Sequence, residues 1–518
     1  MTKKRCLKII DLLGILFVTF FVYNILSPIQ SVCTLYADDL LSPFWPFFNI
    51  QLSNPLSIFL TSNHLSWVLS LFHCLTVRLL PIAFGIHPQV FVQTAFFPFA
   101  CFIFTLYLYC VANNFNKYSK IKHLTFVWAL LLFPLAISIL CKSEFLWIFT
   151  QCCWFYAYVF VLLFGIIAFC EIQSFYVNKE HFSKKRLITF LILIFLIGGC
   201  FEFSKFILGS TLILGLLLDR IFTREPVTNK KTILFLVYSL FCCTYSLLVP
   251  TTIIHSDSYL KLFSFEELMN FLPSYFSEYW HYVIVDNCIF YVLIAVLLLL
   301  IHIFGEDKLK NKRFYIYSIS TLLSVLLFNF AIIIGSNITY YSSILAHSGV
   351  RFCNTTMLLC LFLSCLGYFI SNTECKKPLL VGSFILLTLY GTYVKKEHFD
   401  FSMMLDSYKV IRQCHYVLDK FFVLHSLKTP VFYNYYTNDL FQNLSISYYI
   451  YFYNSKFKPT EYKIIDITDK SYSVPDKMHY IAIRDLMVNK CKEITGYQIT
   501  DEELEKMDFQ SLYQYKTN

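Results

Sequence analysis

The chain has 518 residues, of which 57% are hydrophobic and only 14% charged, a composition that excludes an ordinary soluble globular protein. The net charge is +9, but the lysines and arginines fall in short clusters between apolar runs. This pattern is typical of cytoplasmic loops rather than of a nucleic-acid-binding face. We therefore predict a polytopic membrane protein that contacts membrane lipids and has no nucleic-acid partner.

Cysteine is abundant, with 19 in all, and most of the cysteines lie inside apolar runs, as Cys101, Cys170 and Cys360 do. A free cysteine in such a run packs as a small hydrophobic residue. No pair of cysteines has the partner set of a zinc site beside it. The sequence therefore predicts no metal site made of thiolates.

The chain begins with a short basic segment, residues 1–5, which predicts a cytoplasmic N-terminus. The apolar run 6–26 is too long for a signal peptide and predicts an uncleaved span. Two adjacent carboxylates, Asp38 and Asp39, follow it directly. An ionisable group near bilayer depth costs about 2.5 to 3.5 kcal/mol at a helix centre and usually marks a site. The alternative is that the pair lies in a solvated loop just past the helix end.

Residues 30–87 form a predicted external loop, in which Pro43, Pro46 and Pro55 act as breakers. The run 65–84 within it is long enough to span a membrane but contains His73 and Arg78. We interpret this run as a helix lying in the outer interface. His64, directly before it, is a candidate substrate-binding residue.

The remaining apolar runs alternate across the membrane if 65–84 does not span. In order they are 88–112, 123–141, 152–172, 186–201, 206–222, 232–250, 282–304, 314–335, 352–371 and 378–394. Every basic cluster then lies inside, whereas the first three clusters after 65–84 fall outside if that run spans, unless another segment is dropped. The positive-inside rule therefore predicts eleven spans, with the C-terminus external.

This topology places isolated charges at outer helix ends and outer loops. The acids are Asp38, Asp39, Glu144, Glu202, Asp257, Glu266, Glu267, Glu278 and Asp286, and the bases are Lys142, Lys205, Lys261, His255, His347 and Arg351. A carboxylate-rich face with a few cations can hold an anionic lipid headgroup and a base for an acceptor hydroxyl.

Two groups on this face are the most informative. Glu202 and Lys205 follow Gly198 and Gly199 where two short apolar runs meet. Because these two residues are three positions apart, their side chains can face one another on one helical turn. The alternative is a self-satisfied ion pair that permits a tight hairpin. Arg351 opens the run 352–371 and is either a phosphate clamp or an interface anchor.

Together these features resemble the GT-C fold of glycosyltransferases that use polyprenyl-phosphate sugars, and more narrowly a bacterial branch of GT-C-like membrane proteins. The resemblance covers roughly residues 1–395. It rests on the acid pair after the first span, the aromatic stretch 150–158, the Gly-rich turn 198–202 and Arg351. Cys152 and Cys153 stand where such proteins often carry Gly and Asn. Residues 250–255 stand where a Pro-Gly-Asn segment with an Arg is common.

The resemblance implies transfer of a sugar from a polyprenyl-phosphate donor to a cell-surface glycan or lipid acceptor, at the external face of a bacterial inner membrane. Asp38 or Asp39 would be the general base. The implied substrate-binding residues are Glu202, Lys205, Arg351, His255, Trp154, Tyr158 and His64. Arg351 and Lys205 would hold the leaving phosphate, and Glu202 would orient Lys205 or the acceptor. Some relatives also use a divalent ion, and nothing in this chain requires one.

The chain divides into a transmembrane domain, 1–394, and a polar tail, 395–518. Short β-like runs at 430–433 and 462–465 and helical runs at 486–492 and 502–512 predict a small external α/β segment. It either binds acceptor or acts as a structural cap.

Two other functions remain open. A flippase or other transporter predicts paired half-repeats and charges near the bilayer midplane. Here no repeat is evident and the charges gather at one face, which favours the transferase. A structural membrane protein without catalysis would tolerate neutralisation of the Asp pair, Glu202 and Arg351.

Overall fold

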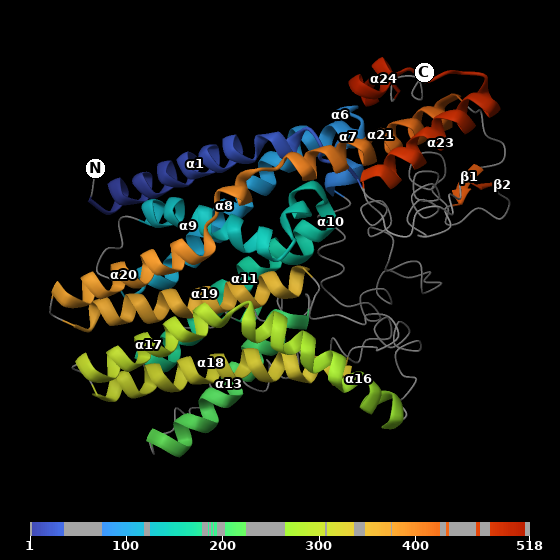
Figure 1. Ribbon diagram of the computed structural model, residues 1–518. Helices are drawn as coiled ribbons and strands as arrows, with labels where there is room; N and C mark the ends of the chain where they lie inside the picture. The colour runs from blue at the N-terminus through green and yellow to red at the C-terminus, as the bar shows by residue number, and fades with distance from the viewer. Residues whose placement is uncertain are drawn as a thin grey trace.

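The computed structural model of the chain describes residues 3–35, 75–118, 125–178, 185, 188–189, 191–193, 202–223, 265–305, 308–335, 348–373, 376–424, 431–434, 463–466 and 477–512. These residues are predominantly helical, and the long apolar helices lie side by side in a bundle (Figure 1). The prediction of an all-α membrane protein is confirmed at this level.

The first 178 residues supply the first part of the bundle. Its elements are α1 (Lys3–Gln30), η2 (Leu75–Leu79), α6 (Leu80–Phe84), α7 (Pro88–Phe91), η3 (Val92–Phe96), α8 (Phe97–Asn116), α9 (Thr125–Lys142), η5 (Leu146–Thr150), α10 (Cys152–Phe155), η6 (Tyr156–Phe160) and α11 (Val161–Asn178). Gly85 separates α6 from α7 in a left-handed conformation, with φ +64°, that favours glycine.

The remainder of the chain completes the bundle and adds the C-terminal elements. These are α13 (Glu202–Thr223), α16 (Phe265–Glu278), η7 (Tyr279–Val285), α17 (Cys288–Phe304), α18 (Lys308–Gly335), α19 (Ser348–Ser371), α20 (Lys376–Tyr393), η9 (Lys396–Phe399), α21 (Ser402–Leu424), β1 (Val431–Asn434), β2 (Lys463–Asp466), α23 (Lys477–Thr495) and α24 (Asp501–Lys506).

Four described helices are long and apolar enough to cross a membrane: Ile9–Gln30, Pro88–Asn116, Thr125–Lys142 and Ser348–Ser371. Two further pairs pass the same test together but are bent, Leu272–Val285 with Cys288–Phe304 by 52° and Lys377–Tyr393 with Lys396–Phe421 by 67°. The described residues therefore supply four candidate spans, or up to six if each bent pair is one span. The predicted runs 186–201 and 232–250 lie largely or wholly outside these residues, so the number eleven stays a prediction.

Helix α19 lies at the centre of the bundle, and 94% of the residues in its most apolar stretch are buried. It packs against α8, α17, α18 and α20. Its contact with α8 is close, because a Cβ added at Gly367 would lie 2.5 Å from the backbone oxygen of Phe115. A glycine there lets the two helix backbones approach, which is a common device between membrane helices.

The helix ends gather into two groups at opposite ends of the bundle. At one end Lys142 of α9 and Arg351 of α19 both contact Asp286, directly before α17. At the other end Asn311 of α18 accepts hydrogen bonds from Tyr368 and Asn372, each at 2.7 Å. The alternation of predicted spans places the first group on one side and the second on the other. Which side is external stays a prediction.

The C-terminal elements follow the bend after α20 and lie near α6 and α7 (Figure 1). Helices α21 and α23 pack along one another, and β1 pairs in parallel with β2, Val431 opposite Lys463. Helix α24 begins with a capping box in which Thr500 and Glu503 bond each other's backbone N–H groups. Helix α21 was not named among the predicted elements of the tail.

The predicted interfacial helix 65–84 is described only from residue 75. Residues 75–84 are helical, as η2 and α6, and the hydroxyl of Thr76 lies 2.7 Å from that of Tyr156. Residues 65–74 lie outside the described part, and the position of this helix in the membrane interface stays a prediction.

Candidate functional site

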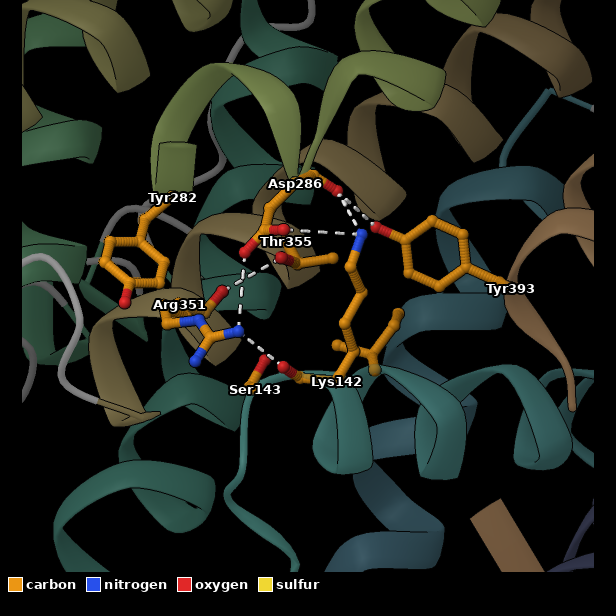
Figure 2. Close-up of a pocket in the computed structure, with 8 residues that line it drawn as sticks. Lys142, Ser143, Tyr282, Asp286, Arg351, Thr355 and Tyr393 are labelled. Atoms are coloured by element: carbon orange, nitrogen blue, oxygen red, sulfur yellow. Dashed lines mark hydrogen bonds and ion pairs between the residues drawn. The ribbon is translucent and has the colours of Figure 1, made fainter. Parts of the chain in front are cut away.

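A small pocket opens at the end of the bundle where α9 ends and α17 and α19 begin (Figure 2). Its lining residues are Ile139, Lys142, Ser143, Tyr282, Asp286, Arg351, Thr355 and Tyr393. The cavity measures ≈ 10 Å³, about the space that one water molecule needs. In this state it is too small for a sugar phosphate.

Two cations share one carboxylate in this pocket. An Nη of Arg351 lies 3.3 Å from one oxygen of Asp286, and Nζ of Lys142 lies 3.7 Å from the other. Charge-assisted N–H···O bonds are usually about 2.7 to 2.9 Å long. The Asp286 carboxylate is therefore held loosely by both cations, and the three groups together carry one excess positive charge.

The backbone around the pocket is held more tightly than this carboxylate. The carbonyl oxygen of Asp286 accepts hydrogen bonds from Nζ of Lys142 at 2.8 Å and from the hydroxyl of Tyr393 at 2.9 Å. Arg351 donates to the carbonyl oxygen of Lys142 at 2.5 Å. Asp286 and Lys142 stand where helical segments end, so their carbonyls are among those that a helix leaves without internal partners.

Aromatic rings flank both cations (Figure 2). The guanidinium carbon of Arg351 lies 4.9 Å from the ring centre of Tyr282, and Nζ of Lys142 lies 5.0 Å from that of Tyr393. Cation–π contacts of this kind contribute about 0.5 to 1 kcal/mol at exposed sites and more where water is excluded. They hold the cations in place without neutralising them.

The floor of the pocket is buried and polar. The Thr355 hydroxyl lies 2.8 Å from Oδ1 of Asn287 and 2.9 Å from the carbonyl oxygen of Arg351. Nearly two turns of α19 before Thr355, the aromatic stretch packs against Gly349. A Cβ at Gly349 would lie 2.1 Å from the Tyr158 ring, and that ring stands edge-on to Phe145 at 5.1 Å. Tyr158, a predicted substrate-binding residue, is fully buried in this packing.

The end of α1 is tied to the same region through η5, which starts four residues after Lys142. The Thr34 N–H donates to the carbonyl of Thr150 at 3.4 Å, and the Cys33 thiol donates to that of Phe149 at 3.3 Å. The Leu35 N–H donates to Oε1 of Gln89 at 3.0 Å. The chain is thus fixed up to Leu35, three residues before the predicted acid pair.

A second buried polar cluster joins the C-terminal helices to the bundle. We call it the C-terminal junction and define it by His87, Gln89, Arg412, His415 and Asp419. His87 accepts the Gln89 N–H at Nδ1, at 3.1 Å, so its Nε2 carries the proton that faces Asp419 at 2.8 Å. Gln89 also contacts His415 at 3.2 Å, and Arg412 donates to the carbonyl of Cys33.

The predicted site residues fall into three groups. Arg351 lines the pocket and Tyr158 lies buried beneath it. Glu202 and Lys205 belong to the first turn of α13 and Trp154 belongs to α10, but their side chains lie outside the described part. Asp38, Asp39, His64 and His255 lie wholly outside the described residues.

The pocket also contains residues that sequence reasoning did not select as site residues. Lys142 and Asp286 were recognised as outer-face charges, and the signal for them was that each stands at the edge of an apolar run. Tyr282 and Tyr393 gave no such signal, since the chain is rich in tyrosine throughout. Within the described residues no group of three or more His, Cys, Asp and Glu side chains is placed to hold a metal ion.

Comparison with known proteins gives no relative for this chain: no family model, no curated protein and no solved structure matches it.

Proposed function

We propose that this chain is a membrane glycosyltransferase of the GT-C type, which moves a sugar from a polyprenyl-phosphate donor to a glycan or lipid acceptor. The observation that carries the proposal is the pair of cations, Lys142 and Arg351, on one pocket at one end of a membrane bundle. Together with Asp286 they leave one excess positive charge, which an anionic headgroup can neutralise.

The chemistry of sugar transfer uses groups of this kind. Cations stabilise the phosphate that leaves with the lipid, Arg351 by a bidentate contact and Lys142 as a point charge. A carboxylate takes the proton from the acceptor hydroxyl. Asp38 and Asp39 are our candidates for this base, since they follow Leu35 by three and four residues. An extended chain covers at most about 11 and 14 Å over those separations.

The remaining parts of the proposal follow the sequence. Glu202, Lys205, His255, Trp154, Tyr158 and His64 complete the set of substrate-binding residues. The chain has eleven spans in a bacterial inner membrane, with the N-terminus in the cytoplasm and the α/β segment 395–518 outside. The excess of basic clusters on the side opposite the pocket supports this orientation.

The test is complementation of a strain from which the gene has been deleted, with its surface glycans and glycolipids compared by mass spectrometry. We expect the deletion to remove one sugar, wild type to restore it, and Asp38→Asn or Asp39→Asn to reduce its incorporation by about 10²- to 10⁴-fold, the usual effect of losing a general base. Asp485→Asn, which changes an exposed carboxylate of α23, is the matched control and should restore the sugar fully.

Two outcomes would overturn the proposal. If both Asp variants restore the glycan at equal protein levels, neither residue is a base and a structural role is favoured. If the deletion removes the whole surface glycan while complete lipid-linked precursors accumulate on the cytoplasmic side, a transporter is favoured.

A further inference from the structure

The pocket carries an anion of its own where a ligand anion would have to bind. We propose that Lys142 and Arg351 take a phosphate group borne by a membrane amphiphile, and that this phosphate displaces the carboxylate of Asp286. The inference rests on the proposed function only in taking a phosphate-bearing lipid as the ligand. It requires no sugar transfer.

Displacement follows first from the size of the site. The cavity of ≈ 10 Å³ has room for about one water molecule beside the two cations. A phosphate group, with four oxygens around phosphorus, cannot enter while the Asp286 carboxylate remains between Lys142 and Arg351. The carboxylate occupies the position in which the geometry of the two cations would hold a phosphate.

The Asp286 side chain is free to leave because its backbone is held by other groups. The Asp286 carbonyl keeps its hydrogen bonds from Lys142 and Tyr393, at 2.8 and 2.9 Å, whatever the side chain does. The carboxylate has contacts of only 3.3 and 3.7 Å and is 18% exposed. A rotation about its side-chain bonds moves the carboxylate toward water at little cost.

Both cations stay in place when the carboxylate leaves. Arg351 is only 11% exposed, donates to the carbonyl of Lys142 and lies over the Tyr282 ring. A guanidinium has five N–H donors and an ammonium has three, so each cation keeps donors for a phosphate. The site therefore exchanges one anion for another and does not have to be built by the ligand.

The surroundings favour an amphiphile over free phosphate. The segment that brings Tyr282 and Asp286 to the pocket also carries exposed apolar side chains, Phe276, Trp280 and Val285. Exposed Val292, Val296, Leu299 and Ile303 continue along α17 at helical spacing. Tryptophan is enriched at the membrane–water interface, where one part of its ring is apolar and the other polar. The alkyl chain of an amphiphile can pack against these exposed apolar side chains, whereas inorganic phosphate has no apolar part that could do so.

The experiment measures binding by the purified full chain in a neutral detergent, with farnesyl phosphate, farnesol and inorganic phosphate as probes. We expect farnesyl phosphate to bind wild type, Asp286→Asn to bind it about tenfold more tightly because the competing anion is gone, and Arg351→Gln to bind it at least tenfold more weakly. Asp286→Glu, which keeps the competing charge, should bind no more tightly than wild type. Asp485→Asn, which removes an equal charge beside Arg484, should leave binding unchanged.

Each alternative outcome has a distinct meaning. Equal or weaker binding by Asp286→Asn, with the thermal unfolding temperature of wild type, would overturn displacement and make Asp286 a simple structural partner. If inorganic phosphate binds as tightly as farnesyl phosphate, or farnesol does, the phosphorylated amphiphile is not the ligand. Tighter binding by Asp286→Asn with no glycan change on gene deletion would leave this inference standing and overturn the transferase. If Asp38→Asn changes the glycan but Arg351→Gln binds farnesyl phosphate as wild type does, the transferase proposal stands and this inference is overturned.

Discussion

The pocket and the C-terminal junction both place a carboxylate beside basic groups, but they do so under opposite conditions. In the junction Asp419 and His87 are almost completely buried and lie 2.8 Å apart. In the pocket Asp286 is 18% exposed, its distances to Arg351 and Lys142 are 3.3 and 3.7 Å, and Lys142 is 42% exposed. One site is closed to solvent, and the other is open and loosely paired.

This difference indicates what each cluster contributes. A buried charge must keep its partner, because water cannot replace it, so the junction is a fixed attachment between distant parts of the chain. The pair of Asp286 with the 42% exposed Lys142 contributes little to stability, and these groups can change partners at small cost. Residues of the junction should therefore matter for folding, and residues of the pocket for ligand binding.

The largest effect is expected for His87→Leu, which leaves the buried carboxylate of Asp419 without its partner. We expect a loss of about 3 to 5 kcal/mol in the free energy of unfolding, measured by denaturation in detergent. The double variant His87→Leu/Asp419→Leu should recover much of this loss, because it leaves no buried carboxylate without its hydrogen-bond partner.

Lys409→Leu is the matched control for this experiment. Lys409 and Glu505 form an ion pair of 2.6 Å whose side chains are 43% and 64% exposed. Such a pair contributes about 0 to 1 kcal/mol. A cost for His87→Leu no larger than that of Lys409→Leu would remove the contrast between closed and open clusters.

A smaller effect is expected from Gly349→Ala, which tests how rigid the floor of the open pocket is. The new Cβ would lie 2.1 Å from the ring of Tyr158, and that ring is fully buried and cannot easily move. Overpacking of this kind costs about 1 to 3 kcal/mol. Because Arg351 follows two residues later, we also expect weaker binding of farnesyl phosphate.

Gly391→Ala in α20 is the control for added volume, since nothing lies within 4 Å of a Cβ at that position. It should be neutral or stabilise the chain by up to about 1 kcal/mol, because alanine favours a helix over glycine. Equal melting temperatures for the two variants would indicate that the floor adapts and that the close contact at Gly349 is not a constraint.

Apolar runs predicted the main helices well, because apolar side chains both raise the hydropathy of a segment and favour its burial in a helix bundle. The run 123–141 corresponds to α9 and the run 352–371 to α19, each within a few residues. The run 282–304 was predicted as one span, whereas the chain bends by 52° between Val285 and Cys288. A hydropathy average over about 19 residues cannot register such a bend, and the bend is what brings Asp286 into the pocket.

Helix α21 was missed for a different reason. Its buried face carries Arg412, His415 and Asp419, spaced by three and four residues, among apolar neighbours. Polar residues are mostly exposed in proteins, so a run of this kind is naturally interpreted as a solvent-facing tail. Partners more than 300 residues earlier help to make burial of these groups possible: His87 and Gln89 at α7, and the carbonyl of Cys33 just after α1.

The pocket could be anticipated only in part from the sequence. The positive-inside rule placed Lys142, Asp286 and Arg351 on one face, and the structure brings these three together. It could not indicate that one carboxylate pairs with both cations, since Lys142 and Asp286 are 144 residues apart. Such a contact depends on how helices pack, and a single sequence carries little information about that.

The last prediction concerns low pH, which should first destabilise residues 496–512, at the rim of the C-terminal junction. Hydrogen bonds from the Ser511 N–H hold the pKa of Asp508 below its usual value of 3.8. Burial raises the pKa of Glu503, but hydrogen bonds from Thr500 and Tyr497 and the ion pair with Lys420 outweigh it, and the net pKa lies below 4.5. Carboxyls with lowered pKa values stabilise the fold above their unfolded pKa, and that contribution is lost as the pH falls through the folded value.

We therefore expect residues 496–512 to keep constant protection from hydrogen exchange, corrected for intrinsic rates, between about pH 7 and 5, and to lose it as the pH falls below about 4.5. Glu503→Gln should show part of this loss already at neutral pH, whereas Glu505→Gln, at a 64% exposed position, should behave as wild type. Residues 412–421 should remain protected at the pH where α24 opens, because their polar groups are bonded inside the protein. Simultaneous exchange of both segments would mean that rim and centre form one cooperative unit, and the closed cluster would then extend to the surface of the C-terminal helices.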